Sequence, residues 1–346
     1  MLEIRIFRFD PKCDVGSYLK PYLCESANFA SVKELLEFIR SGDPYFSFED
    51  VKFVKINGTV VALDEDFGEI VAKFGKNLII TPLNKREAYK DLSCRFNSFL
   101  SKFDEFASIA NADTMEFYKE LAPYFYANEI PKFSEIFLGN SGFVFANFLL
   151  ENFSEKRAEI LKFIAPQLPY YEPCNALNLE YDCALIYDKL CELCGHSRAQ
   201  NDKILSSESM AEIDTSSLKH RFDGFKVAVW DDEAARNLAQ KLGSDIVDFE
   251  RQNAMLGREI YAQEKSCALR MAGEILFDAF DSGADFLLVN SKNALSFIDG
   301  KAGEICALFN RELLNFYLLS TDEFIALARG EKPSSLANHK LKVRLI

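Results

Sequence analysis

The sequence has few of the residues and motifs on which many familiar enzyme sites depend. Its 346 residues include only three histidines, His196, His220 and His339, so general acid–base catalysis has few candidates. A GxSxG motif is absent, as are GxGxxG and GxxxxGK[ST], which hold a hydrolase nucleophile or cradle phosphates. These absences disfavour α/β-hydrolases, dinucleotide-binding dehydrogenases and P-loop NTPases.

Positive charge and long apolar runs are also scarce. The chain carries 40 Lys and Arg against 53 Asp and Glu, and this net charge of −13 disfavours nucleic acid and anionic membranes as partners. No apolar run approaches the roughly 20 residues that span a bilayer. Residues 1–10 alternate apolar and charged side chains instead of forming the apolar core of a signal peptide. We therefore expect a cytoplasmic protein with no membrane span.

Residues 1–83 predict a small mixed sheet. Apolar and charged side chains alternate over residues 2–6, as in a strand with one buried face. An amphipathic helix follows over 32–40, and Asn57-Gly58 joins two short strands, a dipeptide typical of tight hairpins. Strand pair, helix, hairpin and last strand together predict a β-grasp domain.

Residues 84–168 predict an all-helical domain. One set of apolar side chains recurs at spacings of three and four, which is typical of a helix that faces a core. Its members are Leu92, Phe96, Phe99, Phe103 and Phe106. An aromatic box for a cofactor is the alternative, but helical spacing alone accounts for the pattern.

Residues 169–330 change pattern, because strands and helices alternate from Lys226 onward, as in a parallel α/β layer. Ser320 and Glu323 predict a capping box for the last helix. Residues 331–346 predict a linker followed by a C-terminal strand or a basic docking tail. The predicted fold class is therefore α+β and α/β multidomain.

Several segments within residues 1–165 resemble the iron–sulfur subunit of succinate dehydrogenase and fumarate reductase. They are IRIFRFDPKCD, SVKELLEFIRSGDP, VKINGTVVALDED and LIITPL. The resemblance implies a ferredoxin-like β-grasp domain with a [2Fe–2S] cluster, whose cysteines follow the position of Phe48, and a helical domain with two more clusters. This chain has no cysteine between Cys24 and Cys94, and none over 95–173. The thiolates that such clusters need are therefore missing.

Residues 169–330 resemble the cysteine-rich (CCG) domain of heterodisulfide reductase proteins of the B type. The similar segments are YYEPC, EYDCALIYDKLCELCG and EKSCALRMAGEILFDAFDSGADFLLVNS. The resemblance implies an α/β domain of two related halves that holds a cluster on cysteines. Where the second half of that family has a CxxC pair, this chain has Asn290 and Asn293. Amides do not replace thiolates on iron, so these are lost-ligand positions.

Residues 174–196 hold the densest group of potential metal or redox ligands. They are Cys174, Cys183, Cys191, Cys194 and His196. Reduced thiols with an imidazole suit zinc or an iron–sulfur cluster, and two neighbouring thiols suit a redox dithiol. Against both, the cysteines over 183–194 share one face of a predicted helix, and buried cysteine is common in protein cores. Core packing, metal binding and redox chemistry all remain open.

Asp231, Asp232 and Glu233 form a second polar group, directly after the predicted strand 226–230. Three carboxylates could bind a metal ion. They also stand where a helix begins, and acidic residues there cap the helix and match its dipole. We favour the capping interpretation.

We expect a non-catalytic scaffold, accessory or assembly protein derived from respiratory iron–sulfur electron-transfer subunits. It would carry no cofactor and bind a protein partner, a subunit of a redox complex, with any membrane association made peripherally through that partner. The alternative is a redox or electron-transfer protein that retains one site at residues 174–196, holding an iron–sulfur cluster, zinc or a dithiol. Any catalysis would then be that of an oxidoreductase-related subunit.

Overall fold

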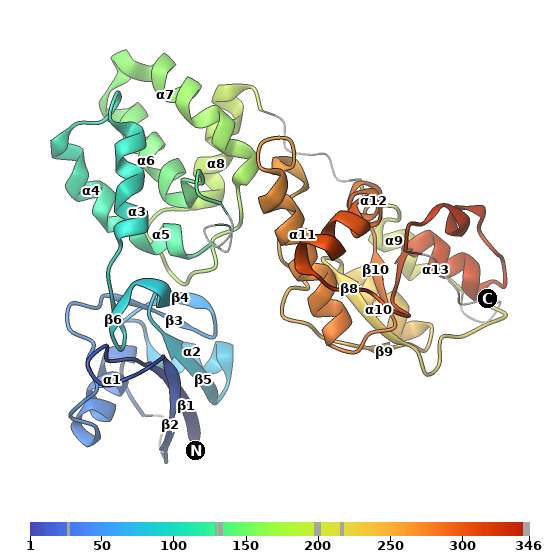
Figure 1. Cartoon of the computed structure of the whole chain (residues 1–346), viewed down its shortest axis with the longest axis horizontal. Helices are drawn as coiled ribbons and strands as arrows, with labels where there is room; N and C mark the ends of the chain where they lie inside the picture. Colours follow the sequence, from blue (N-terminus) through green and yellow to red (C-terminus); the bar gives the residue numbers. More distant parts are fainter. Residues whose placement is uncertain (26–27, 129, 131–133, 197–201, 215–217, 342–346) are drawn as a thin grey trace. The chain divides into compact units, whose positions relative to one another are not determined.

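The computed structural model describes residues 1–25, 28–128, 130, 134–196, 202–214 and 218–341. The chain forms two compact units, Met1–His196 and Ser197–Ile346 (Figure 1). Helices and β-sheet occur in both units, so the predicted mixed α/β multidomain class is confirmed. None of the helices within these ranges is long and apolar enough to cross a membrane.

The first unit begins with a five-stranded sheet in the order β2-β1-β5-β3-β4. The strands are β1 (Leu2–Arg8), β2 (Tyr18–Cys24), β3 (Phe53–Ile56), β4 (Thr59–Ala62) and β5 (Asn77–Thr81). Strands β1 and β5 pair in parallel, and the remaining pairs are antiparallel. Asn57 and Gly58 both have positive φ, 48° and 87°, as a two-residue hairpin requires. Helices α1 (Val32–Gly42) and α2 (Phe67–Phe74) complete the β-grasp arrangement that the sequence predicted.

A short hairpin separates this sheet from the helices, where the sequence predicted helix alone. It pairs β6 (Ala88–Lys90) with β7 (Ser93–Cys94). Leu92 at its tip is buried in the core of the β-grasp sheet, whereas Phe99 and Phe106 are buried among the helices. The apolar stripe is therefore divided between two cores, because strand β7 follows Leu92 and the first of these helices begins only at Asn97.

The helices of the first unit pack around aromatic side chains. They are α3 (Asn97–Leu100), α4 (Met115–Glu120), α5 (Ala122–Tyr126), α6 (Gly139–Asn152), α7 (Arg157–Ile164) and α8 (Cys183–Cys194). Phe99 stacks on Tyr118 with ring centroids 4.6 Å apart, and Phe106 meets Phe145 edge to face at 4.9 Å. These rings fill a protein core, as the helical spacing predicted.

Helix α8 belongs to the first unit, so the boundary predicted at 168/169 lies instead at 196/197. Its buried residues Cys183, Tyr187 and Leu190 join the same core cluster as α6 and α7. An apolar stripe on a helix must pack against another apolar surface, and here that surface is the helical bundle.

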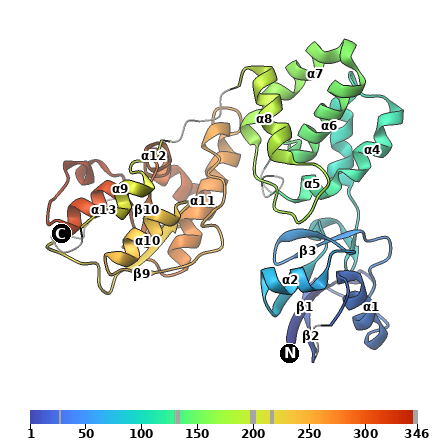
Figure 2. The ribbon, with the colours of Figure 1, turned by 180° about the vertical axis from the view of Figure 1, so that it is seen from behind.

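The second unit contains one four-stranded parallel sheet in the order β11-β10-β8-β9. Its strands are β8 (Lys226–Trp230), β9 (Asp245–Ile246), β10 (Phe286–Val289) and β11 (Tyr317–Ser320). The helices are α9 (Ser207–Ala211), α10 (Glu233–Lys241), α11 (Lys265–Asp281), α12 (Lys292–Phe309) and α13 (Thr321–Ala328). One core lies between the sheet and α11 and α12, and a second lies on the face of α10 and α13 (Figure 2).

The prediction of two related α/β halves is wrong. The described residues between 169 and 225 contribute no strand to this sheet, and those up to 196 pack in the first unit. Ser320 and Glu323 do form the predicted capping box. The predicted C-terminal strand falls mainly on residues 342–346, which lie outside the described residues. Before them, the tail forms the short 3-10 helix η9 (Ser334–Asn338).

Candidate functional site

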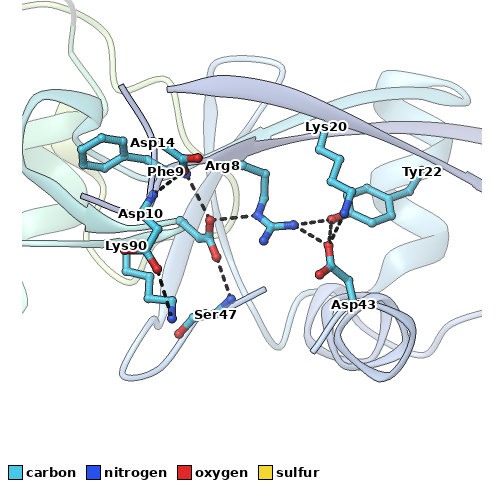
Figure 3. Close-up of polar contacts among 10 residues, drawn as sticks. Arg8, Phe9, Asp10, Asp14, Lys20, Tyr22, Asp43, Ser47 and Lys90 are labelled. Atoms are coloured by element: carbon cyan, nitrogen blue, oxygen red, sulfur yellow. Dashed lines mark hydrogen bonds and ion pairs between the residues drawn. The ribbon is translucent and has the colours of Figure 1, made fainter. Parts of the chain in front are cut away.

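The position at which the resemblance places a [2Fe–2S] loop is closed by buried ion pairs. The Arg8 guanidinium donates from Nε to Asp91 at 2.8 Å and also pairs with Asp43 (Figure 3). Asp91 accepts a further hydrogen bond from the backbone N–H of Ser47 at 2.9 Å, beside Phe48. Arg8, Asp43 and Asp91 are each at most 7% exposed. This network fastens the segment from Asp43 to Ser47 to strand β1.

The charges in this network are fixed by their partners. Burial alone would raise the pKa of Asp43, but hydrogen bonds from Lys20, Tyr22 and Arg8 outweigh it and hold that pKa below its ordinary value. The distances from Asp43 to the Lys20 ammonium and the Tyr22 hydroxyl are 2.6 and 2.7 Å (Figure 3). Carboxylates that are fully paired in this way have little capacity left for a ligand, and removing their cation would leave a buried charge uncompensated.

Two of the predicted site cysteines come together in the first unit. Cys174 lies in the extended segment before α8, and Cys183 is the first residue of that helix. The side chains of Cys174 and Cys183 are neighbours that interact with each other, and the Cys183 thiol also lies 3.9 Å from the Tyr181 carbonyl. Cys183 is only 5% exposed, whereas Cys174 is partly exposed. The arrangement is therefore a thiol pair with one accessible and one shielded member.

The two thiols differ in acidity. The hydrogen bond from Cys183 lowers the pKa of Cys174, burial opposes this, and the side chain of Asn140 lowers it further. The hydrogen bond with Cys174, burial and the charge of Asp182 all raise the pKa of Cys183. Because the thiolate is the reactive form of cysteine, the lowered pKa and the partial exposure of Cys174 favour it as the more reactive thiol of this pair.

The remaining predicted ligands lie at the other end of α8. Eleven residues of helix separate Cys183 from Cys194, which corresponds to about 16 Å. Cys191 is 7% exposed and belongs to the buried stripe, and Cys194 Sγ lies 3.7 Å from the carbonyl of Leu161. The backbone N–H of His196 donates to the Cys191 carbonyl at 2.9 Å. These contacts are those of a packed helix end.

Within the ranges that the structure describes, no three His, Cys, Asp or Glu side chains converge as a metal-binding group. An iron–sulfur cluster of the kind that the resemblances imply needs four ligands, mostly thiolates. The Cys174–Cys183 pair supplies two. The residues described here do not fit a cluster, and the chemistry of the pair is that of two thiols.

Asn290, a predicted lost-ligand position, follows β10 directly at the carboxyl end of the sheet. Its amide donates to the Leu205 carbonyl and to Asp232 at 3.0 and 2.9 Å. Its Oδ1 accepts from the Leu205 N–H and from the Thr321 hydroxyl at 3.0 and 2.7 Å. Every donor and acceptor of this side chain is therefore used within the protein.

Segment 202–205 closes this end of the sheet. Lys203 forms an antiparallel bridge with Ser291, and Asp202 accepts from the Asn293 N–H at 2.6 Å in the first turn of α12. Strand β9 lies on one side of β8 and strand β10 on the other, so the topological switch point of the sheet lies between β8 and β10. Open parallel sheets bind ligands at the carboxyl ends of the strands beside such a point. Here the chain itself occupies that position.

The acidic group after β8 caps a helix, as we favoured. Asp232 is the N-cap of α10 and accepts from the Ala235 N–H at 2.8 Å. Asp232 also pairs with the Lys203 ammonium at 3.0 Å. Burial and the neighbouring Asp232 charge raise the pKa of Asp231, whose backbone has φ 51°.

The sequence reasoning missed two asparagines beside the thiol pair. Asn128 follows α5, Asn140 lies in the first turn of α6, and both are almost fully buried. Their side chains donate to the Glu172 carbonyl at 3.2 and 3.0 Å, two residues before Cys174. Neither lies in a local motif, and only the tertiary fold brings them to Cys174.

Comparisons with known proteins show the fold alone. No family model matches the chain, and no curated protein matches it. Among solved structures, the chain is similar to a hypothetical protein from Helicobacter pylori, with 16% sequence identity and a TM-score of 0.77. The match covers 100% of this chain and 98% of that one, so the chain shares its fold with that Helicobacter pylori protein over almost their whole lengths.

Proposed function

We propose that this protein is a thiol–disulfide redox protein that exchanges two electrons through Cys174 and Cys183. The contact between the two sulfurs carries the proposal, because a dithiol can close to a disulfide only when its sulfurs are neighbours. The two thiols would have different roles because they differ in exposure. Partly exposed Cys174 would form the mixed disulfide with the partner, and buried Cys183 would then attack that mixed disulfide. Disulfides of cytosolic proteins are usually transient and catalytic or redox-sensing, which suits such a pair.

The reaction balances with a partner disulfide as oxidant. The Cys174 thiolate attacks one sulfur of that disulfide, forms a mixed disulfide and expels the other partner sulfur as a thiolate, which takes up a proton. Cys183 then loses its proton and attacks the Cys174 sulfur, which expels the second partner thiolate. The two thiols of this protein are oxidised to a disulfide, and one partner disulfide is reduced to two thiols. Reduction of this protein runs the same steps backward.

The test is a redox titration of the full chain in mixtures of reduced and oxidised glutathione, followed by peptide mass spectrometry. We expect a disulfide between Cys174 and Cys183, and a trapped mixed disulfide on Cys174 in the Cys183→Ser variant. A Cys191→Ser variant is the matched control and should oxidise like the wild type. Failure to form the 174–183 disulfide at any ratio would refute the proposal, as would one equivalent of iron or zinc bound to these thiols after anaerobic purification.

A second candidate function is a non-catalytic scaffold, and the closed sheet edge of the second unit favours it. Asn290 and segment 202–205 fill the position at which parallel α/β domains bind small ligands. A domain that fills its own ligand site with saturated hydrogen bonds is suited to bind through its surface. The scaffold would be derived from iron–sulfur electron-transfer subunits and would bind a subunit of a redox complex.

The scaffold function predicts that the purified chain binds a defined redox subunit whether or not Cys174 is present. Cross-linking mass spectrometry should map that contact onto the second unit, and the Cys174→Ser variant should retain it. Loss of the contact in this variant would assign partner binding to the thiol pair instead.

A further inference from the structure

Asn140 is an unusual residue to find in the core of a helical domain. Its side chain is 0% exposed, in the first turn of α6, and its Oδ1 has no hydrogen-bond partner among the described residues. A buried polar atom without a partner costs free energy, so its presence calls for a reason. Its Nδ2 supplies one, because it lies within reach of both the Glu172 carbonyl and the Cys174 sulfur.

We propose that Asn140 is the positioning residue that makes Cys174, and not Cys183, the attacking thiol of the pair. This inference rests on the redox function proposed above. Asn140 would do so in two ways: its amide holds the backbone before Cys174, and the same amide donates to the Cys174 sulfur.

The backbone on both sides of Cys174 is fixed to the helical bundle. Before it, the Glu172 carbonyl accepts from the amides of Asn140 and Asn128. After it, the Asn175 N–H donates to the Ala127 carbonyl at 3.0 Å. The segment of Cys174 is therefore held to the start of α6, a 14-residue helix whose dipole favours a negative charge at that end. The Asn140 N–H itself donates to Asn128 Oδ1.

The groups around Cys183, in contrast, favour the protonated thiol. Cys183 follows the Asp182 carboxylate, which caps α8 by accepting from the N–H groups of Ala184 and Leu185. Its sulfur lies 3.9 Å from the Tyr181 carbonyl, which is an acceptor and favours the protonated thiol. The amide donor favours the thiolate form of Cys174, and the carbonyl acceptor favours the thiol form of Cys183.

The test compares Asn140→Asp, Asn140→Ala and Asn128→Ala in the full chain, each in a Cys183→Ser background and in the wild type. Asn140→Asp keeps the shape but replaces the donor with an acceptor. Asn128→Ala is the matched control, because it removes the other anchor of the Glu172 carbonyl without touching a cysteine. The readout is the pH profile of iodoacetamide alkylation at Cys174, resolved by peptide mass spectrometry.

We expect the midpoint of the Cys174 profile to move to higher pH in both Asn140 variants, most in Asn140→Asp. A shift of one pH unit lowers the alkylation rate near neutral pH by about tenfold. Asn128→Ala should leave the midpoint within a few tenths of a unit. Superimposable profiles for folded Asn140→Asp and wild type would overturn the inference, even if the 174–183 disulfide still formed. Absence of that disulfide would instead refute the redox function.

A measurement on the unmutated chain decides the matter if the Asn140 variants do not fold. With asparagine labelled by nitrogen-15, the side-chain amide signal of Asn140 should shift with pH at the alkylation midpoint of Cys174. The shift should vanish in Cys174→Ser. An Asn140 signal that does not respond to pH in the wild type would also overturn the inference.

Discussion

Val60 in β4 forms a parallel bridge with Ala176, two residues after Cys174. The Val60 N–H donates to the Asn175 carbonyl and the Val60 carbonyl accepts from the Leu177 N–H, both at 2.9 Å. The segment that carries the accessible thiol thus extends the edge of the β-grasp sheet, while its other side is fixed to the helical bundle. The thiol pair lies where these two parts of the first unit are joined.

The Thr59→Val variant tests this joint. The Thr59 hydroxyl donates to Asn175 Oδ1 at 2.9 Å and is 6% exposed, so Val removes one buried hydrogen bond at nearly constant volume. We expect a loss of about 1 kcal/mol in the free energy of unfolding. Amide hydrogen exchange should become faster at residues 175–177. Thr59→Ser keeps the hydroxyl, and equally fast exchange in that variant would contradict the role of the hydrogen bond.

Arg8→Met should be among the most damaging substitutions in the first unit. It leaves the buried carboxylates of Asp43 and Asp91 without their common cation, a change that typically costs about 3–5 kcal/mol. Arg5→Met is the control on the same strand, because its pair with Glu3 is half exposed, and it should cost less than about 1 kcal/mol. Urea unfolding followed by circular dichroism measures both, and equal effects would contradict the buried network.

The same network predicts acid sensitivity. The pKa of Asp43 in the folded protein lies below its ordinary value of 3.8. Its contribution to stability is therefore complete above about pH 5 and is lost as the pH falls through the lowered folded-state value. The wild type should lose urea resistance between about pH 4 and pH 2. The Asp43→Asn variant should show a shallower loss over that interval, and an unchanged slope would assign the acid transition to other groups.

Cys191 provides a test of shielding at the far end of α8. Cys191→Ala should cost about 1–2 kcal/mol through a small cavity, whereas Cys13→Ala, at an exposed site, should cost less than about 0.5 kcal/mol. Native-state alkylation of Cys191 should be slow beside that of Cys174. Rapid alkylation of Cys191 would contradict core packing and favour the redox interpretation. Release of a stoichiometric metal ion by the substitution would favour the metal interpretation.

The elements that the sequence predicted well are those whose signals are local. Asn57-Gly58 specified the β3–β4 hairpin because positive φ suits both residues, and the box of Ser320 and Glu323 specified the start of α13. The packing partner of α8 was not predictable in this way. A buried stripe shows that a helix packs, but it does not show against which surface.

The candidate site was predictable only in part, for the same reason. Cysteine count and spacing indicated Cys174 and Cys183, but equally Cys191 and Cys194, which lie about two and three helical turns away from Cys183. Asn140 gave no signal, because an asparagine in an apolar segment looks like any other polar interruption. Its role depends on a contact with a residue 34 positions along the chain.

Asn290→Ala should selectively destabilise the second unit. It removes hydrogen bonds to both backbone groups of Leu205, to Asp232 and to Thr321, and leaves buried partners unsatisfied. We expect a loss of roughly 1–3 kcal/mol, with faster hydrogen exchange over residues 202–206. The single tryptophan, Trp230, lies at the end of β8, so its fluorescence reports urea unfolding of this unit.

Asn293→Ala is the control for this substitution, because the side chain of Asn293 is exposed and should contribute less than about 0.5 kcal/mol. The Trp230 transition should move to lower urea in Asn290→Ala and stay in place in Asn293→Ala. If segment 202–205 closes the sheet edge only through Asn290, the variant should also expose apolar surface to a hydrophobic dye before global unfolding. Equal transitions in both variants would mean that the bridge between Lys203 and Ser291 holds the segment without Asn290.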